Sequence, residues 1–209
     1  MRPIIDRIDD LLGRPDDLNP LFAPHWGWHD DHRDADGTSD YCPAVMQVRR
    51  ETELLLGHLA VELPREDVAD PYHLGHRALQ LGIGYEHGAS HELLRLAFDR
   101  VLSIDLHSCR IDDRRLPGLN TVDPATLALA ATHAPFDLLF IDAGHDVDDV
   151  RCDHEIFAPL VRRGGFVAFH DALPRPAYPE VQIYRYLAGL PTAITVVGSE
   201  VGTAWLRVE

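Results

Sequence analysis

The sequence predicts a three-layer α/β fold around a mostly parallel sheet. Three observations support this prediction. Apolar segments of strand length alternate with helical segments from about residue 76 onward, the strand segments are continuously apolar, and the first of them runs into a glycine-containing loop. Continuous apolar strands indicate a sheet that helices cover on both faces. With 209 residues, the chain is long enough for one such domain.

The elements follow one another in a regular order. Strands are expected at residues 76–84, 100–106, 136–142, 165–171, 193–199 and 202–208, and helices at 46–60, 89–98, 123–134, 147–161 and 179–190. Asp123 and Pro124 are typical of a helix start, because aspartate caps the free N–H groups and proline suits the first helical position. The last two strands are joined by too few residues for a crossover, so they are expected to pair antiparallel.

The N-terminal part of the chain has a different character. Residues 1–17 predict a short amphipathic helix, and residues 24–40 predict a polar loop or lid without secondary structure. The histidines of this loop are His25, His29 and His32. Two hypotheses stay open for them: a separate metal site, or a solvated lid over an aromatic acceptor. We divide the chain into a helical and lid extension at 1–70 and a main domain at 71–209.

The composition excludes several classes of protein. Nineteen basic residues against 34 acidic ones give a net charge of −15, which disfavours nucleic-acid binding. Because the sequence lacks an apolar run of the roughly 20 residues that a membrane span needs, and lacks the pattern of a signal peptide, we expect a cytoplasmic protein. The three cysteines form no C-x-x-C pair and indicate reduced thiols: Cys42, Cys109 and Cys152.

A glycine loop follows the first strand of the main domain. Gly82, Gly84 and Gly88 lie in it, and the next strand ends at Asp105, 23 residues after Gly82. An acid at the tip of the second strand is suited to bind the two hydroxyls of a ribose. The G-x-G-x-x-x-G spacing differs from that of NAD and FAD sites and, with the C-terminal strand pair, favours S-adenosylmethionine. The alternative is a tight turn beside a surface aspartate.

A second group of polar residues follows two later strands. Asp142 and Asp171 end strands that are separated by one helix, so both carboxylates are expected at the carboxyl edge of the sheet. Two converging carboxylates repel each other unless a cation or proton lies between them, and Mg²⁺ or Mn²⁺ would fit there. His145 and His170 lie next to these acids. The alternative is that Asp171 caps the next turn and Asp142 only orders its loop.

At these residues the sequence resembles the class I S-adenosylmethionine-dependent methyltransferases. It is most similar to methyltransferase family 24, which shades into the catechol-type O-methyltransferases. The matching stretches are LQLGIGYEHGAS, VLSIDL, DPATLA, FDLLFIDAGHDVDDVRCDHEIFAPLVRRGGFVAFHD and the closing strand pair, over roughly residues 75–209. The most specific part combines F-I-D-x-x-H with GG-x-V-x-x-H-D.

The resemblance implies a Rossmann-like sandwich with a seven-stranded sheet in the order 3-2-1-4-5-7-6, its seventh strand antiparallel. It implies methyl transfer from S-adenosylmethionine to a hydroxyl of a small molecule of natural-product type, assisted by a divalent metal such as Mg²⁺ or Mn²⁺. The expected partner is this small-molecule acceptor, with no nucleic acid and no membrane. A homodimer is a further expectation.

The resemblance also assigns residues. The expected cofactor-binding residues are Gln80, Gly82, Gly84, Gly88, Ser90, Asp105, Asp123 and Asp142. The expected metal ligands are Asp142, Asp171 and His170, and the general base is His145 or its rival His170. The sequence departs from the family pattern in three places. Asn120 lies where many relatives carry the acid of a G-D-S motif. Gln80 replaces the usual glutamate of the first strand, and Ala172 follows Asp171 where the catechol-type enzymes carry a further Asn or Asp, which leaves His170, His145 or water as third ligand.

Two other functions remain open. The protein could be a non-catalytic cofactor-binding or scaffold protein of the same fold, which Gln80 and the missing third metal acid favour. It could also be a hydroxylase-like or hydrolytic metalloenzyme that uses His145, His170 and Asp171. Binding of S-adenosylmethionine separates the first two functions from the third.

Overall fold

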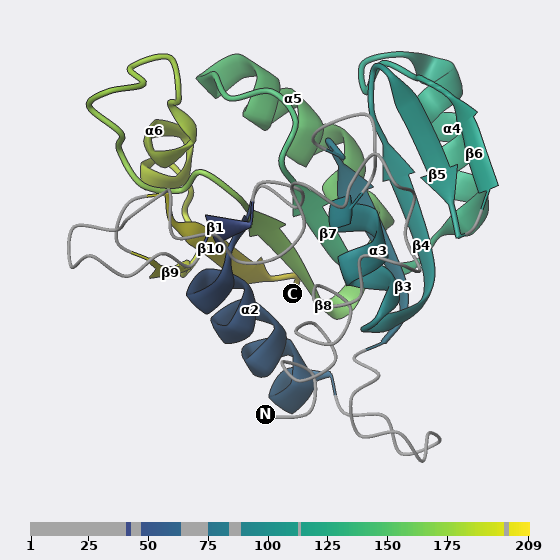
Figure 1. Cartoon of the computed structure of the whole chain (residues 1–209), viewed down its shortest axis with the longest axis horizontal. Coiled ribbons are helices and arrows are strands. Elements are labelled where there is room, and N and C mark those ends of the chain that lie inside the picture. The colour runs from purple at the N-terminus through teal and green to yellow at the C-terminus, as the bar shows by residue number, and fades with distance from the viewer. Residues whose placement is uncertain (1–40, 43–46, 64–74, 84–88, 113, 199–200) are drawn as a thin grey trace.

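A computed structural model of the whole chain describes residues 41–42, 47–63, 75–83, 89–112, 114–198 and 201–209 (Figure 1). The expected helix at 1–17 and the loop with His25, His29 and His32 lie outside these residues. The division of the chain at residue 70 therefore stays a prediction. Among the described helices, none is both long and apolar enough for a membrane crossing.

An eight-stranded sheet forms the middle of the domain, in the order β6-β5-β4-β3-β7-β8-β10-β9. Its strands are β3 (Gly75–Leu81), β4 (Phe98–Ile104), β5 (Ser108–Ile111), β6 (Arg114–Pro117), β7 (Phe136–Ile141), β8 (Val161–Phe169), β9 (Thr195–Val197) and β10 (Thr203–Arg207). The four central strands β4, β3, β7 and β8 are parallel. A separate ladder pairs β1 (Tyr41–Cys42) with β2 (Gln47–Val48).

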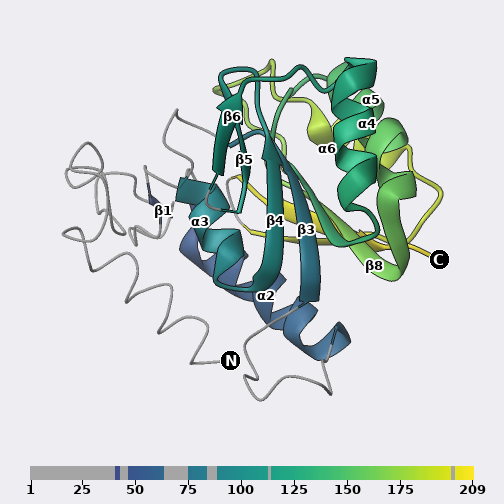
Figure 2. The same ribbon diagram turned by 90° about the vertical axis from the view of Figure 1, so that its right-hand side faces the viewer.

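Helices cover both faces of this sheet (Figure 2). They are α2 (Arg49–Glu62), α3 (Ala89–Arg95), α4 (Pro124–His133), α5 (Val147–Phe157), the short 3₁₀ helix η3 (Ala158–Leu160) and α6 (Ile183–Ala188). Neighbouring residues of one strand face opposite layers: Ala78 packs with α2 and α3, whereas Leu79 packs with α4, α5 and α6. Burial on both faces explains why the central strands are continuously apolar.

The prediction of seven strands was wrong in one place. Where a single third strand was expected at the sheet edge, the structure has the antiparallel hairpin β5–β6, so the sheet has eight strands. The loop from Ile104 to Ser108 is too short for a crossover, and β5 therefore returns antiparallel to β4. The rest of the order is confirmed, including the antiparallel pairing of β10 with β8.

Two helix boundaries also differ from the prediction. The helix expected at 147–161 ends at Phe157, because Pro159 has no N–H group to continue it and falls in η3. The helix expected at 179–190 begins only at Ile183, because residues 173–182 form turns such as the hydrogen bond from Tyr178 N to Arg175 O. These turns place a run of exposed side chains beside the end of β8.

Candidate active site

Gly82 joins the carboxyl ends of three parallel strands. Its N–H donates to Ile104 O at 2.8 Å, and Asp142 N donates to Leu81 O at 2.8 Å. Its φ of +81° lies in the left-handed region, and a Cβ at this position would overlap the Asp142 carbonyl group. Glycine is therefore required for the ends of β3 and β7 to approach each other, and the site forms above this contact.

Asp105 follows β4 at the same edge of the sheet, and its carboxylate is held in a fixed orientation. Its Oδ2 accepts a hydrogen bond from Ile83 N at 3.0 Å, and its Oδ1 accepts one from His107 N at 2.8 Å. The side chain is half-buried. Because a carboxylate offers about four lone-pair positions, both oxygens can still accept a ligand hydroxyl. This arrangement fits the predicted ribose contact.

A buried polar network lies below the glycine loop. Gln80 Nε2 donates to Ser90 Oγ at 2.7 Å, and Ser90 Oγ donates to Ile83 O at 2.7 Å. The Ser103 hydroxyl lies 3.0 Å from Gln80 Oε1 and 2.7 Å from Nδ1 of His91. All four side chains of the network are buried. The network therefore connects the start of α3 to the end of β3 and fixes the backbone at Ile83.

The remaining predicted cofactor residues have different surroundings. Gln80 and Ser90 are engaged in the buried network, and Asp123 caps α4, its Oδ1 accepting from Ala125 N at 2.9 Å. Their contact with a cofactor stays a prediction. Gly84 and Gly88 lie outside the described residues.

His91 gives the network a pH dependence that can be measured. Burial lowers the pKa of His91 to about 4. The folded state therefore binds this proton more weakly than the unfolded chain, so stability is complete above pH 6.5 and is lost as the pH falls toward 4, by about 3 kcal/mol in total. We expect His91→Gln to remove this loss. The measurement is urea unfolding of wild type and variant at pH 7 and pH 4.

The comparison of variant with wild type is needed because another buried group opposes His91. Burial raises the pKa of Asp153 to about 6, so that carboxyl group favours the folded state as the pH falls. His107→Gln, at an exposed histidine, serves as the control. Identical pH dependence in wild type and His91→Gln would contradict the prediction.

A cluster of acids and imidazoles lies where β7 and β8 end. His170 Nδ1 lies 3.0 Å from Asp142 Oδ1 and 3.5 Å from Asp171 Oδ2, and His145 Nε2 lies 3.0 Å from the same Asp171 oxygen. Asp171 has a φ of +53°, which is uncommon outside glycine and turns its carboxylate back toward these rings. The structure thus brings together all four residues that the sequence singled out at these strand ends.

Charge interactions stabilise the cluster in an ionised state. Burial alone would lower the pKa of His170, but the charge and hydrogen bond of Asp142, followed by those of Asp171, raise it to about 10. Burial alone would raise the pKa of Asp171, but hydrogen bonds from His145 and His170 hold it well below its usual range. His170 is therefore a buried cation between two carboxylates.

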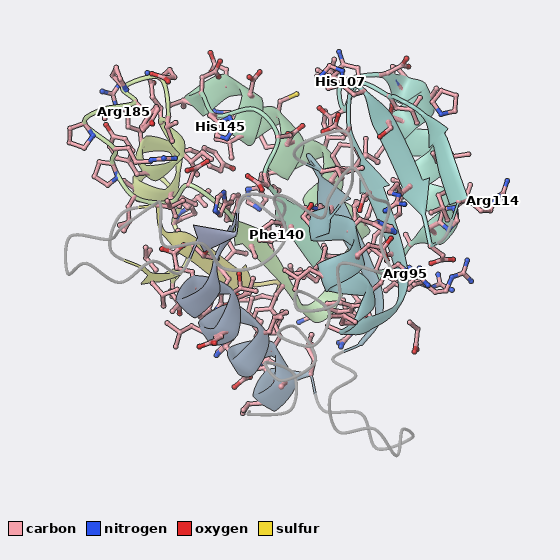
Figure 3. All side chains as sticks on the ribbon, in the orientation of Figure 1. Arg95, His107, Arg114, Phe140, His145 and Arg185 are labelled. Carbon is pink, nitrogen blue, oxygen red and sulfur yellow. The ribbon has the colours of Figure 1, made fainter. Side chains whose placement is uncertain are left out.

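His145 and His170 differ in access. The side chain of His145 is 41% exposed, and that of His170 only 6%. The hydrogen bond to Asp171 raises the pKa of His145, against the opposing effect of burial. Its backbone is fixed, because Gln182 N donates to His145 O at 2.7 Å and Asp146 caps the helix that follows. Figure 3 places His145 on the same edge of the molecule as His107, which is two residues after Asp105 in the chain.

Arg175 is a residue of this cluster that the sequence reasoning missed. Its guanidinium Nη1 lies 2.6 Å from Asp171 Oδ1, on the opposite carboxylate oxygen from the two histidines. The guanidinium carbon lies 4.5 Å from the centre of the Tyr178 ring. The spacing of Asp171 and Arg175, four residues apart, was the available sign of an ion pair, although such spacing is informative mainly on helices.

Three of these residues offer donors for a metal ion. Asp142, His170 and Asp171 each present one ligand atom, and the three atoms lie within 4.8 Å of one another. Oxygen atoms on opposite sides of a Mg²⁺ ion lie about 4.2 Å apart, so the group has the right scale. Among the described residues, Nε2 of His170 is also a buried nitrogen without a hydrogen-bond partner. The donor set fits Mg²⁺ or Mn²⁺.

Comparison with known proteins identifies a methyltransferase domain in the part of the chain that carries this arrangement. Residues 81–172 match the family model described as a methyltransferase domain. The match covers 92 of the 209 residues, so the comparison shows a methyltransferase domain in this part of the chain. The matched segment begins at the last residue of β3 and ends directly after Asp171, so it contains both groups of strand-end residues.

Solved structures share the fold of this chain at low sequence identity. An O-methyltransferase from Bacillus cereus in complex with SAH is 14% identical, with a TM-score of 0.53, over 98% of this chain and 90% of that one. CalS11, a TDP-rhamnose 3′-O-methyltransferase of calicheamicin biosynthesis, is 14% identical with a TM-score of 0.50, over 98% and 92%. A comparison with curated proteins gave no match.

A third similar structure is much longer than this chain. The MycE methyltransferase of the mycinamycin pathway, in complex with Mg and SAH, is 20% identical with a TM-score of 0.46, over 63% of this chain and 44% of that one. The chain thus spans less than half the length of MycE.

Proposed function

We propose that the protein transfers the methyl group of S-adenosylmethionine to a hydroxyl of a small molecule, with help from a divalent metal. One observation carries this proposal. Within the methyltransferase domain, two groups lie at the same edge of the sheet. One is the oriented carboxylate of Asp105 at the end of β4, and the other is the exposed imidazole of His145 after β7, which pairs with the buried carboxylate of Asp171. This arrangement supports a cofactor site and a base for the acceptor at one edge of the sheet.

Asp105 and Gly82 account for cofactor binding. The lone pairs of Asp105 that Ile83 and His107 leave unused accept the ribose hydroxyls. Gly82 closes the strand ends so that the ligand can approach the main chain. The cofactor supplies a methyl group on a positively charged sulfur, which makes that carbon electrophilic.

His145 accepts the proton of the acceptor. The acceptor oxygen forms the new bond to the methyl carbon, the bond from that carbon to sulfur breaks, and its electron pair stays on the sulfur. The hydroxyl proton goes to the imidazole, which Asp171 orients and whose positive charge it stabilises. His170 is buried between Asp142 and Asp171 and is less accessible to an acceptor.

Asp142, Asp171 and His170 would hold the metal ion. Such an ion would lower the pKa of the acceptor hydroxyl and orient it. Support for an oxygen acceptor comes from the similar structures, which include an O-methyltransferase and a sugar O-methyltransferase. The identity of the acceptor and the homodimer stay predictions.

Asp105→Ala tests the cofactor site. We expect this variant to bind S-adenosylmethionine more weakly by about 1.5–3 kcal/mol, because hydrogen bonds to a charged group are lost. This loss corresponds to a roughly 10- to 150-fold higher Kd. Isothermal titration calorimetry with S-adenosylmethionine and with its demethylated product, with and without Mg²⁺, measures it.

Asp148→Ala is a matched control, since Asp148 is an exposed aspartate on α5 whose carboxylate pairs with Arg151. Unchanged affinity in a folded Asp105→Ala protein would remove the cofactor from the tip of β4. If the wild type binds neither compound, the metal-dependent hydrolase or hydroxylase hypothesis takes the place of methyl transfer. Binding without methyl transfer to any hydroxyl acceptor would favour the scaffold hypothesis.

A further inference from the structure

Arg175 occupies a position that a metal ion would compete for. Its Nη1 lies 2.6 Å from Asp171 Oδ1, and its side chain is 28% exposed beside a carboxylate that is only 6% exposed. Asp171 is also one of the three possible metal ligands. The same carboxylate therefore has two different cationic partners available to it.

Charge repulsion indicates that the two partners compete for Asp171. The guanidinium of Arg175 already lies 2.6 Å from one oxygen of this buried carboxylate. A divalent ion bound by Asp171 would bring two further positive charges close to the guanidinium. Like charges at such short distances in a poorly solvated site repel strongly, so the ion pair of Arg175 has to open.

We propose that Arg175 is an exchangeable counter-ion of Asp171, which holds this carboxylate in the metal-free protein and releases it when a divalent ion binds. The inference rests on the metal part of the proposed function. Arg175 is then not a metal ligand itself, but it sets the affinity of the three ligands for the ion.

The surroundings of Arg175 allow this exchange at little structural cost. The guanidinium lies 4.5 Å over the ring of Tyr178, which is 49% exposed, and the backbone between them is fixed by the hydrogen bond from Tyr178 N to Arg175 O. An arginine over an aromatic ring is stabilised by a cation–π interaction. After it leaves Asp171, the guanidinium therefore remains at the mouth of the site, on Tyr178.

Titration of the full-length protein with Mn²⁺ tests the proposal. Calorimetry gives the Kd for Mn²⁺ of the wild type, Arg175→Gln and Arg175→Lys. We expect Arg175→Gln to bind Mn²⁺ about tenfold more tightly, because the competing charge is gone, and Arg175→Lys to stay close to the wild type. Arg185→Gln is the matched control, since Arg185 also lies over a tyrosine ring, that of Tyr184. Its Kd should not change.

Thermal unfolding gives a second measurement that holds even if Arg175→Gln is less stable without metal. Mn²⁺ should raise the Tm of Arg175→Gln by more than it raises that of the wild type. Equal or weaker Mn²⁺ binding by Arg175→Gln, with clear binding by the wild type, would overturn the exchange and leave the metal site intact. If no variant binds Mn²⁺, the exchange and the metal part of the proposed function both fail, while the cofactor site is judged by Asp105→Ala.

Discussion

His145→Ala is expected to lower kcat by about 10²- to 10⁴-fold while leaving the Kd for S-adenosylmethionine nearly unchanged. The imidazole is exposed at the mouth, is oriented by Asp171 at 3.0 Å, and sits on a backbone that Gln182 fixes. It is thus positioned to take the acceptor's proton as the new bond to oxygen forms. Steady-state kinetics with a hydroxyl acceptor, together with calorimetry of cofactor binding, separate the two effects.

Two further histidine variants make this result specific. His107→Ala removes an exposed imidazole from the same edge of the sheet and should leave kcat unchanged. His170→Ala removes the buried cation between Asp142 and Asp171, so it should impair the ordering of both carboxylates and lower the stability of the protein. Near-normal turnover by His145→Ala, beside an inactive but stably folded His170→Ala, would transfer the role of base to His170.

The strand ends could be predicted because their pattern is local. Three of the four central strands, β4, β7 and β8, end in apolar residues that lead to an acid, and parallel strands place all such acids at one edge. That reasoning located Asp105, Asp142 and Asp171 at the edge where the structure has them. Periodicity and spacing are sufficient for this because the sheet is buried on both faces, so an acid that directly follows an apolar run marks the end of a strand.

The parts that the sequence did not predict depend on tertiary contacts. The hairpin β5–β6 carries polar and arginine residues in place of an apolar run, because it lies at the sheet edge, so it lacks the pattern of a strand in this fold. Arg175 meets Asp171 only because Asp171 adopts a positive φ and the following residues form turns. The buried position of Gln80 depends on Ser90 and Ser103, which belong to two other elements.

Gly82→Ala is expected to destabilise the protein by about 4 kcal/mol or more, the second large effect that the structure predicts. Two costs combine at this position. A residue with a Cβ at φ +81° is strained by roughly 1–2 kcal/mol, and the added carbon would overlap the backbone carbonyl of Asp142. Since backbone cannot move aside as a flexible side chain can, β3 and β7 would have to separate where the cofactor and metal residues meet.

Gly164→Ala separates the two costs. Gly164 also has a positive φ, +76°, but a Cβ there would meet only the ends of arginine side chains, Arg162 at 3.5 Å and Arg207 at 3.7 Å. This control should therefore lose only the conformational part, roughly 1–2 kcal/mol. Urea unfolding of both variants measures the difference between them. Similar losses of stability in the two variants would mean that the close approach of Gly82 to Asp142 does not hold the strand ends together. A much larger loss for Gly82→Ala would identify this backbone contact as the support on which both groups of site residues are built.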